Sequence, residues 1–301
     1  MSKRTKIWLI AAASLLIIGI TLFAVTMAVN GWDFKRLNTA ELETNTHEIS
    51  EDFKDISIDS STADIKFVLS DDGKCRVVCD EFEKEKHSVR IENGTLKVAL
   101  NEDKEWYEHI GFNLGSPEIT IYLPRKEFGD LTIDLSTGDT EIPKDFIFET
   151  VNISCTTGSV ITKDVSAESV DISLSTGRIE ISDLDCKGDL KLKSSTGDTE
   201  LVNVNCKNLI STGTTGDLEM NKVLATDGFF IERSTGDVEL EDCDAEEISI
   251  ETDTGDVSGS LLTEKIFFVS TDTGDVEVPK STSGGRCEIT TDTGDVKIAI
   301  K

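Results

Sequence analysis

The 301-residue sequence has few histidines, few prolines and a shortage of positive charge. It contains three histidines, four prolines, and 30 lysines and arginines against 58 acidic residues, for a formal net charge of −28. So acidic a surface repels phosphate backbones and anionic lipid headgroups, which argues against nucleic-acid binding as a function. Three histidines also argue against metal sites built from several imidazoles. A shortage of proline is typical of chains rich in inner β-strands, whose backbone N–H groups must all be free to donate.

One long apolar run stands apart from this polar composition. Residues 7–29 form 23 consecutive positions without a charged side chain. A helix of that length spans roughly 35 Å, enough to cross a hydrocarbon core of about 30 Å. The preceding residues MSKRTK are basic, which favours the cytoplasmic side of a membrane. We predict a single-pass cell-membrane protein with residues 1–6 in the cytoplasm, residues 7–29 as a transmembrane helix, and the C-terminal remainder outside the cytoplasm.

A cleaved secretory signal is the alternative for this segment. Thr26, Met27 and Ala28 could serve as a weak cleavage site, and Lys35 and Arg36 reduce the charge asymmetry across the span. Signal peptides usually have an apolar region of about 7–15 residues, which is shorter than this run. We carry the retained anchor forward, and cleavage stays open.

The rest of the chain is dominated by a repeat. The dipeptide Thr-Gly recurs at intervals of 19 or 20 residues, and apolar side chains recur seven and five residues before nearly every glycine and two residues after most of them. Apolar residues at alternate positions predict strands with one buried face. The repeated glycines are Gly138, Gly158, Gly177, Gly197, Gly216, Gly236, Gly255, Gly274 and Gly294. Each unit is therefore predicted to be a strand, a Thr-Gly-Asp turn, a second strand and a polar corner.

This repeat predicts an all-β fold, a β-solenoid with 19–20 residues per coil. One unit cannot bury its apolar face alone, whereas stacked units form a continuous core with about 4.8 Å per coil. Glycine suits the turn because positive φ costs it nothing, and we expect the following Asp to bond back to its own turn. A meander of ordinary hairpins is the alternative, but such folds rarely keep so regular a period.

The same register begins before the first Thr-Gly turn. Around Ala63, apolar residues occupy the equivalent positions, including Ile58 and Ile65, whereas residues between 70 and 125 are less regular. We predict a linker at residues 30–50, an irregular N-terminal part or cap of the solenoid at 51–129, and the regular solenoid at 130–301. A small separate β-domain over residues 51–125 is the alternative. The last strand, residues 296–300, is expected to leave an exposed sheet edge at the end of the stack.

The pattern resembles a known bacterial family. The N-terminal span, the segments ISIDSSTADIKFVL and ITIYLP, and reiterated STGDVEL-like units are similar to the putative adhesin family of β-strand-repeat membrane proteins. The resemblance covers residues 53–301. It implies a bacterial envelope protein, often from Gram-positive species, with a β-solenoid ectodomain and no catalytic residues. Ser159 and Arg178 stand where the motif has Asp, which weakens any function that needs a complete column of aspartates.

Stacked aspartates are the one candidate metal site. In the last three units an Asp both precedes and follows the Thr-Gly turn, so six carboxylates are expected along one edge. Close carboxylates repel by about 1 kcal/mol per pair in water, and Ca²⁺ would relieve this. The alternative is a row of solvated turn residues, since known Ca²⁺ loop motifs are absent. The candidates are Asp253, Asp256, Asp272, Asp275, Asp292 and Asp295; no other cofactor is expected.

Threonines accompany these aspartates on the predicted edge. They could form a flat Thr-x-Thr surface that orders water or sugar, although threonine is also simply favourable in half-exposed strands. The six residues are Thr252, Thr254, Thr271, Thr273, Thr291 and Thr293.

The seven cysteines are an odd number, which argues against a full disulfide framework. Cys155 and Cys287 fall in apolar rows that face inward, where free thiols behave as small apolar side chains. Cys186, Cys206 and Cys243 share the corner after the second strand and are expected to stack there. Cys75 and Cys79 would lie about 13 Å apart along a strand, too far to bond. We predict buried free thiols.

An adhesin-like structural or binding role is the function that the sequence favours, with a surface polymer or another envelope protein as partner and the oligomeric state open. An ectodomain that regulates envelope-stress sensing is the alternative. A β-helix enzyme acting on polysaccharides is disfavoured, because His47, His87 and His109 all precede the regular coils and coils of 19–20 residues have no long loops to build a cleft.

Overall fold

The computed structural model describes residues 2–29, 31–32, 42–83, 85–101, 115–143 and 145–301. His109, and residues 30 and 33–41 of the expected linker, lie outside the described residues. The described residues form two compact units, one containing the N-terminal helix and the other containing nearly all of the residues in β-strands.

The N-terminal apolar run forms a single helix, α1 (Lys3–Val29). Its segment Arg4–Val29 has a mean hydropathy of 2.5 and is long and apolar enough to cross a membrane. The hydroxyls of Ser14 and Thr21 donate to carbonyls four residues earlier, at 2.8 and 2.7 Å. These polar groups are thereby satisfied within the helix, as an apolar surrounding requires.

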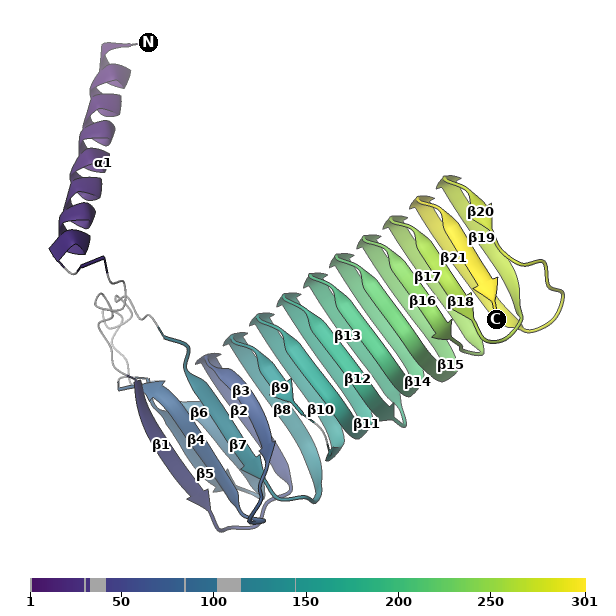
Figure 1. The fold of residues 1–301 in the computed structure, drawn as a ribbon, viewed down its shortest axis with the longest axis horizontal. Helices are drawn as coiled ribbons and strands as arrows, with labels where there is room; N and C mark the ends of the chain where they lie inside the picture. The colour runs from purple at the N-terminus through teal and green to yellow at the C-terminus, as the bar shows by residue number, and fades with distance from the viewer. Residues whose placement is uncertain (1, 30, 33–41, 84, 102–114, 144) are drawn as a thin grey trace. The chain divides into compact units, whose positions relative to one another are not determined.

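The described residues from Leu42 onward form a β-solenoid, as predicted (Figure 1). The strands that lead into the Thr-Gly turns lie parallel and in register, so that Ile153 pairs with Ile133 on one side and with Ile172 on the other. The hairpin alternative is wrong, because hairpins would make neighbouring strands antiparallel. Between β8 and β17 these strands are β8 (Glu127–Thr137), β10 (Phe146–Thr157), the second part of β11 (Val160–Thr176), β13 (Asp189–Thr196), the second parts of β14 (Thr199–Thr215) and β15 (Leu218–Thr235), and β17 (Glu247–Thr254).

The strands that follow the turns form a second parallel ladder. Val160 pairs with Thr140 and Ile179, and the same register continues along the stack. The ladder consists of β9 (Thr140–Ile142), the first part of β11, β12 (Ile179–Cys186), the first parts of β14 and β15, β16 (Val238–Cys243) and β18 (Val257–Leu261).

The four coils that begin at Gly158, Gly177, Gly197 and Gly216 also have a third inward-facing row that the sequence analysis missed. Seven residues after the turn glycine, Val165, Leu184, Val204 and Val223 are buried in the core. The preceding residue in each coil has positive φ, 52–55° at Asp164, Asp183, Asn203 and Lys222. This left-handed corner shifts the alternation of inward and outward side chains, so a search for simple period-two alternation does not find the row.

The turn glycines are required by the stacking itself. Their φ angles lie between 129° at Gly216 and 157° at Gly294. A Cβ added to Gly158 would lie 1.9 Å from the carbonyl oxygen of Gly138 in the neighbouring coil. Any larger residue would therefore push two coils apart, in addition to the cost of its backbone conformation.

At the N-terminal end, the first coil in sequence is not the outermost one. It consists of β2 (Asp55–Thr62) and β3 (Asp64–Leu69) and lies between the coil of β8 and β9 and the parallel strands β6 (Thr95–Leu100) and β7 (Glu118–Leu123). Antiparallel strands follow: β5 (His87–Glu92) on β6, and β4 (Cys75–Phe82) on β7. Antiparallel cover of this kind protects the end of a stack from edge pairing.

Residues 42–50 differ from the linker that the sequence suggested. Leu42–Ile49 forms strand β1, which pairs with β4. The side chains of this strand are exposed or only half-buried, so its sequence is polar and has no apolar alternation that would predict a strand.

At the C-terminal end, the last two coils are exchanged. β21 (Gly285–Thr293) lies between β17 and β19 (Lys265–Thr273), and β22 (Val296–Ile300) lies between β18 and β20 (Val276–Glu277). Figure 1 shows that the yellow coil, which contains β21 and ends at the C-terminus, lies between the coil of β17 and the outermost, lime coil of β19. The prediction of an exposed edge at residues 296–300 is therefore wrong for Val296 and Lys297, which β20 covers, whereas no described strand pairs with residues 298–300 on that side. Ile289 and Val296 are buried in the stack, whereas Val276 of the outermost coil is 46% exposed.

Candidate functional site

The aspartates that follow the turn glycines form a hydrogen-bonded ladder. The Oδ1 of Asp217 accepts the backbone N–H of Asp237, and the Oδ1 of Asp237 accepts that of Asp256, both at 2.8 Å. The same bond joins Asp64 to Asp139, Asp139 to Ser159, Asp198 to Asp217, Asp256 to Asp295, and Asp295 to Asp275, at 2.7–3.1 Å. The expected bond back to the same turn is thus replaced by a bond between coils, which stabilises their stacking.

The six predicted calcium ligands form two neighbouring rows on this edge. Asp256, Asp295 and Asp275 follow one another in the ladder, in that spatial order. Asp253, Asp292 and Asp272 are exposed and sit between paired threonines, such as Thr252 with Thr291 and Thr254 with Thr293. Within the described ranges, no three His, Cys, Asp or Glu side chains are grouped to hold a metal ion. Calcium binding here stays a prediction, which calorimetry with millimolar Ca²⁺ tests.

The flat Thr-x-Thr surface is not formed. Thr252 and Thr291 are buried, whereas Thr254 and Thr293 are exposed. The buried hydroxyl of Thr291 donates to the carbonyl of Gly255 at 3.3 Å, and that of Thr271 donates to the carbonyl of Gly294 at 3.1 Å. These threonine hydroxyls therefore bond to carbonyls of the turn glycines. They can do so because the alternation of inward and outward side chains ends one residue before each Thr-Gly, so that the two threonines of each unit do not share a face.

A buried polar network in the N-terminal strands was not predicted from the sequence. The hydroxyl of Ser60 lies 2.9 Å from His87 Nε2, and His87 Nδ1 lies 2.8 Å from Glu81 Oε2. Asn45 Nδ2 donates to Glu81 Oε1 at 2.8 Å. The order of contacts is that of a serine-hydrolase triad. Ser60, however, is only 2% exposed, so a substrate carbonyl has no approach to its oxygen. The network satisfies buried polar groups of four strands, β1, β2, β4 and β5.

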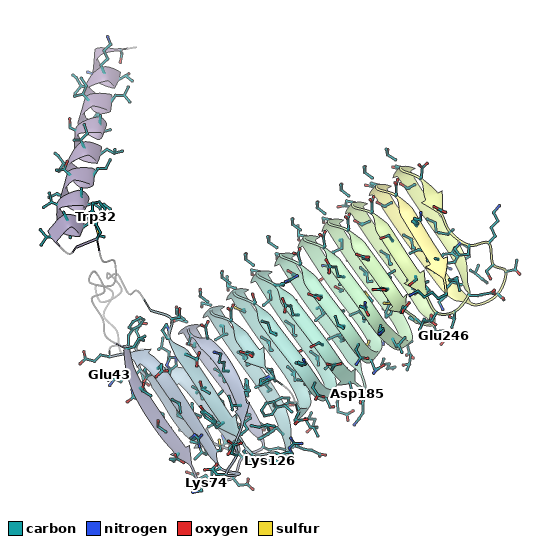
Figure 2. All side chains as sticks on the ribbon, viewed as in Figure 1. Trp32, Glu43, Lys74, Lys126, Asp185 and Glu246 are labelled. Carbon is teal, nitrogen blue, oxygen red and sulfur yellow. The ribbon has the colours of Figure 1, made fainter. Side chains whose placement is uncertain are left out.

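The outward side chains repeat in rows along the stack (Figure 2). One row is acidic in four successive coils: Glu180, Glu200, Glu219 and Glu239 pair in register across β12, β14, β15 and β16. Arg178 contacts the first two of them, at 3.0 and 3.5 Å. The other two carboxylates are exposed. Like charges directly opposite each other on neighbouring strands are destabilising, so this row weakens the stack that carries it.

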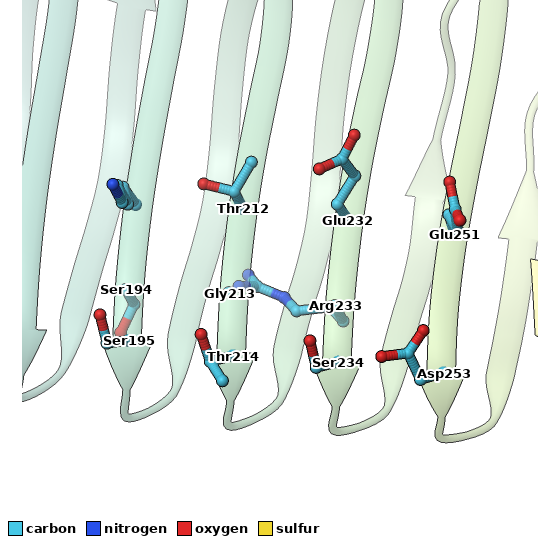
Figure 3. A pocket seen from close by; sticks show the side chains of 11 residues that line it. Ser194, Ser195, Thr212, Gly213, Thr214, Glu232, Arg233, Ser234, Glu251 and Asp253 are labelled. Carbon is cyan, nitrogen blue, oxygen red and sulfur yellow. The ribbon is translucent and has the colours of Figure 1, made fainter.

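A shallow depression of about 390 Å³ lies on the outer face of the strands before the turns (Figure 3). Its walls are two rows of outward side chains from four coils. The first row is Lys193, Thr212, Glu232 and Glu251, and the second is Ser195, Thr214, Ser234 and Asp253. Hydroxyls and carboxylates predominate, and they could hydrogen-bond to a polar polymer. Gly213 and Arg233 lie between the rows.

All seven cysteines are free and buried, as predicted. Burial raises the pKa of Cys79, Cys206 and Cys287 to about 12, so these thiols stay protonated at neutral pH. Cys186 and Cys206 lie in the same inward row of neighbouring coils, nine residues after their turn glycines. Cys243 does not share that row, because it lies seven residues after Gly236.

Comparison with known proteins identifies a related family. The family model described as Toastrack DUF4097 matches residues 53–222 and 207–301. No curated protein matches the sequence.

Several solved bacterial structures are similar to the chain. A putative adhesin from Parabacteroides merdae has 10% identity and a TM-score of 0.50, covering 87% of this chain and 98% of that one. A putative lipid binding protein from Parabacteroides distasonis has 15% identity and a TM-score of 0.44, covering 85% and 97%. A putative adhesin from Bacteroides fragilis has 14% identity and a TM-score of 0.43, covering 86% and 97%. At these identities the likeness concerns the fold.

Proposed function

Because the chain belongs to the Toastrack DUF4097 family, we propose that it is an adhesin-like binding protein of the bacterial cell envelope. The apolar helix α1 anchors it in the cell membrane as a single span, with the N-terminus in the cytoplasm and the β-solenoid outside. The solenoid binds a surface polymer or another envelope protein and does not catalyse a reaction. The description of a protein of this fold as a putative adhesin agrees with this role.

The observation that carries the proposal is the acidic row Glu180, Glu200, Glu219 and Glu239. A row of like charges weakens the fold, so its presence is explained best by a partner that offers cations or hydrogen-bond donors at a repeating distance. Parallel strands about 4.8 Å apart hold these carboxylates at a fixed spacing, which suits a polymer or an extended protein segment.

Catalysis is disfavoured by the position of the triad-like group found among the described residues. Ser60, His87 and Glu81 are each at most 5% exposed. A nucleophile must reach its substrate at hydrogen-bond distance, and these side chains are instead covered by the strands that they connect. The outer faces offer shallow depressions such as the one at Gly213, which suit binding more than the sequestering of a reaction from water.

The proposed topology can be tested with single cysteines, because the native cysteines are all buried. Thr282→Cys places a thiol on the exposed loop that precedes β21, and Ser2→Cys places one before α1. A membrane-impermeant maleimide added to intact cells should label the Thr282→Cys protein and should label the Ser2→Cys protein only after permeabilisation. Equal labelling of both without permeabilisation, or labelling of Ser2→Cys alone, contradicts the proposal.

The binding role can be tested by deletion and complementation. Cells lacking the protein should attach less to a host or matrix surface. The wild type should restore attachment, and a variant with Glu180, Glu200, Glu219 and Glu239 changed to Gln should not. The matched control changes four outward acids on other rows, Asp59, Asp134, Asp171 and Asp185, to their amides, and should restore attachment. If attachment is unchanged by the deletion while stress-response output changes, the regulatory alternative replaces this proposal.

A further inference from the structure

One arginine lies in a row that otherwise faces the core with apolar or small side chains. Arg233 is three residues before its turn glycine, and Leu135, Cys155 and Leu174 hold the same position in other coils. It pairs in register with Gly213 on one side and Thr252 on the other. Arg233 is only 4% exposed. A guanidinium is almost never buried without a partner.

The guanidinium of Arg233 lacks an anionic partner. Its Nη2 donates to the hydroxyl of Ser211 at 2.9 Å, and its Nε has no hydrogen-bond partner. Across the described part of the chain, no carboxylate forms an ion pair with it. Burial lowers the pKa of Arg233 to about 10, against an opposing influence of the Asp217 charge. A desolvated cation with one neutral partner is costly unless an anion joins it.

Gly213 provides the space that the guanidinium occupies. A Cβ at Gly213 would lie 1.6 Å from Arg233 Nη1, so any other residue there would displace the arginine. Gly213 is itself half-exposed, and both residues line the depression of about 390 Å³ (Figure 3). The missing side chain therefore brings the buried cation next to an opening on the outer face. Lys193 adds a second positive charge to the same depression.

We propose that Arg233 and Gly213 form a binding site for a single monovalent anionic group, either a free halide or the carboxylate of a larger ligand. The anion would accept hydrogen bonds from the unpaired guanidinium N–H groups and would offset the cost of their burial. Glu232, Glu251 and Asp253 surround the opening. Their negative charge repels polyanions and limits the site to one anionic group. This inference is independent of the proposed envelope role.

The direct test is a crystal of the full chain in detergent, grown or soaked with bromide and measured for anomalous scattering. We expect a bromide within hydrogen-bond distance of the Arg233 guanidinium, and its displacement by acetate. A water molecule alone at the guanidinium, with bromide present, would overturn the proposal. Displacement of bromide by a short polyphosphate would overturn the limit to a single anionic group.

The solution test measures how much bromide or acetate raises the melting temperature of the wild type and of each variant. All are compared at equal salt concentration, because screening of the net charge of −28 then raises the melting temperature of all of them alike. The wild type should gain several degrees more than Arg233→Met, which keeps the volume without the charge, and more than Gly213→Ala, which closes the space. Arg286→Gln removes an exposed guanidinium outside the acidic row and should behave as the wild type does. Equal gains in Arg233→Met and wild type would contradict the site.

Discussion

The carboxylate oxygen Oδ1 of Asp217 accepts the backbone N–H of Asp237 in the next coil, at 2.8 Å. This bond repeats along the Thr-Gly-Asp edge and makes each aspartate a link between coils. It explains why Asp follows the turn glycine so regularly without requiring a bound metal.

Asp237 makes two bonds in the ladder: its backbone N–H donates to Asp217, and its carboxylate accepts the backbone N–H of Asp256. Substituting its side chain removes only the second bond. Asp237→Ala should lower the free energy of unfolding by about 1–2 kcal/mol, because a charge-assisted bond is lost and a backbone N–H is left without its partner. Asp237→Asn keeps a carbonyl acceptor and should cost less. Urea unfolding measures both. Asp171→Ala, an exposed acid of β11, is the control; a loss there as large as in Asp237→Ala would refute the ladder's contribution.

Two glycine substitutions separate backbone strain from collision between coils. Gly216 and Gly73 both have positive φ, 129° and 71°. A Cβ at Gly216 would lie 2.3 Å from the carbonyl oxygen of Gly197, whereas a Cβ at Gly73 meets nothing within 4 Å. Gly73→Ala should therefore cost about 1 kcal/mol of stability, and Gly216→Ala distinctly more, because strain and collision add. Similar losses in both variants would mean that the coils are not stacked as closely as described.

Lys222 adopts a backbone conformation that is unfavourable for lysine. It has a φ of 55°, at the corner position where Asp164, Asp183, Asn203 and Asp242 occur in other coils. Asn and Asp adopt this left-handed conformation more readily than lysine. Lys222→Asn should raise the melting temperature, by the equivalent of about 0.5–1 kcal/mol. Lys191→Asn, in an extended outward position of β13, should be neutral or slightly destabilising. A loss of stability in Lys222→Asn would show that the lysine has another role.

The buried thiols predict a loss of stability in alkali. Burial raises the pKa of Cys287 from 9.0 to about 12, so the folded thiol keeps a proton that the unfolded one releases. Its contribution to stability is complete below pH 9 and is lost as pH rises toward 12, by about 1.4 kcal/mol per pH unit for one thiol. Cys287→Val should have a shallower decline of the unfolding free energy between pH 9 and 11 than the wild type. Parallel curves would refute the contribution of this thiol.

The sequence predicts the fold well where the position of a residue within its repeat decides whether its side chain is buried. The row of Ile133, Ile153 and Ile172 was expected to face inward and does. The row of Val165 and Leu184 was missed, because the left-handed corner before it breaks the alternation. The periodicity of the sequence could not predict the exchange of the last two coils, because the apolar rows stay in register whichever of the two coils is outermost.

The internal polar groups could not be predicted for a different reason. Ser60 meets His87 only because β2 and β5 are brought together in the folded cap. Arg233 occupies an inward position that its residue type alone would place outside. In both cases the partner lies on another coil or strand, and spacing along one sequence carries no information about that contact.

The central claim, a parallel in-register stack whose last two coils are exchanged, is tested most directly by disulfide cross-linking. Neighbouring parallel strands are about 4.8 Å apart, within the range that a disulfide spans, and the native thiols are buried. Asp253→Cys with Asp292→Cys joins β17 to β21 and should cross-link readily under mild oxidation. Asp253→Cys with Asp272→Cys spans two coils and should not. Cross-linking of the second pair but not the first, or of neither pair, would contradict the account.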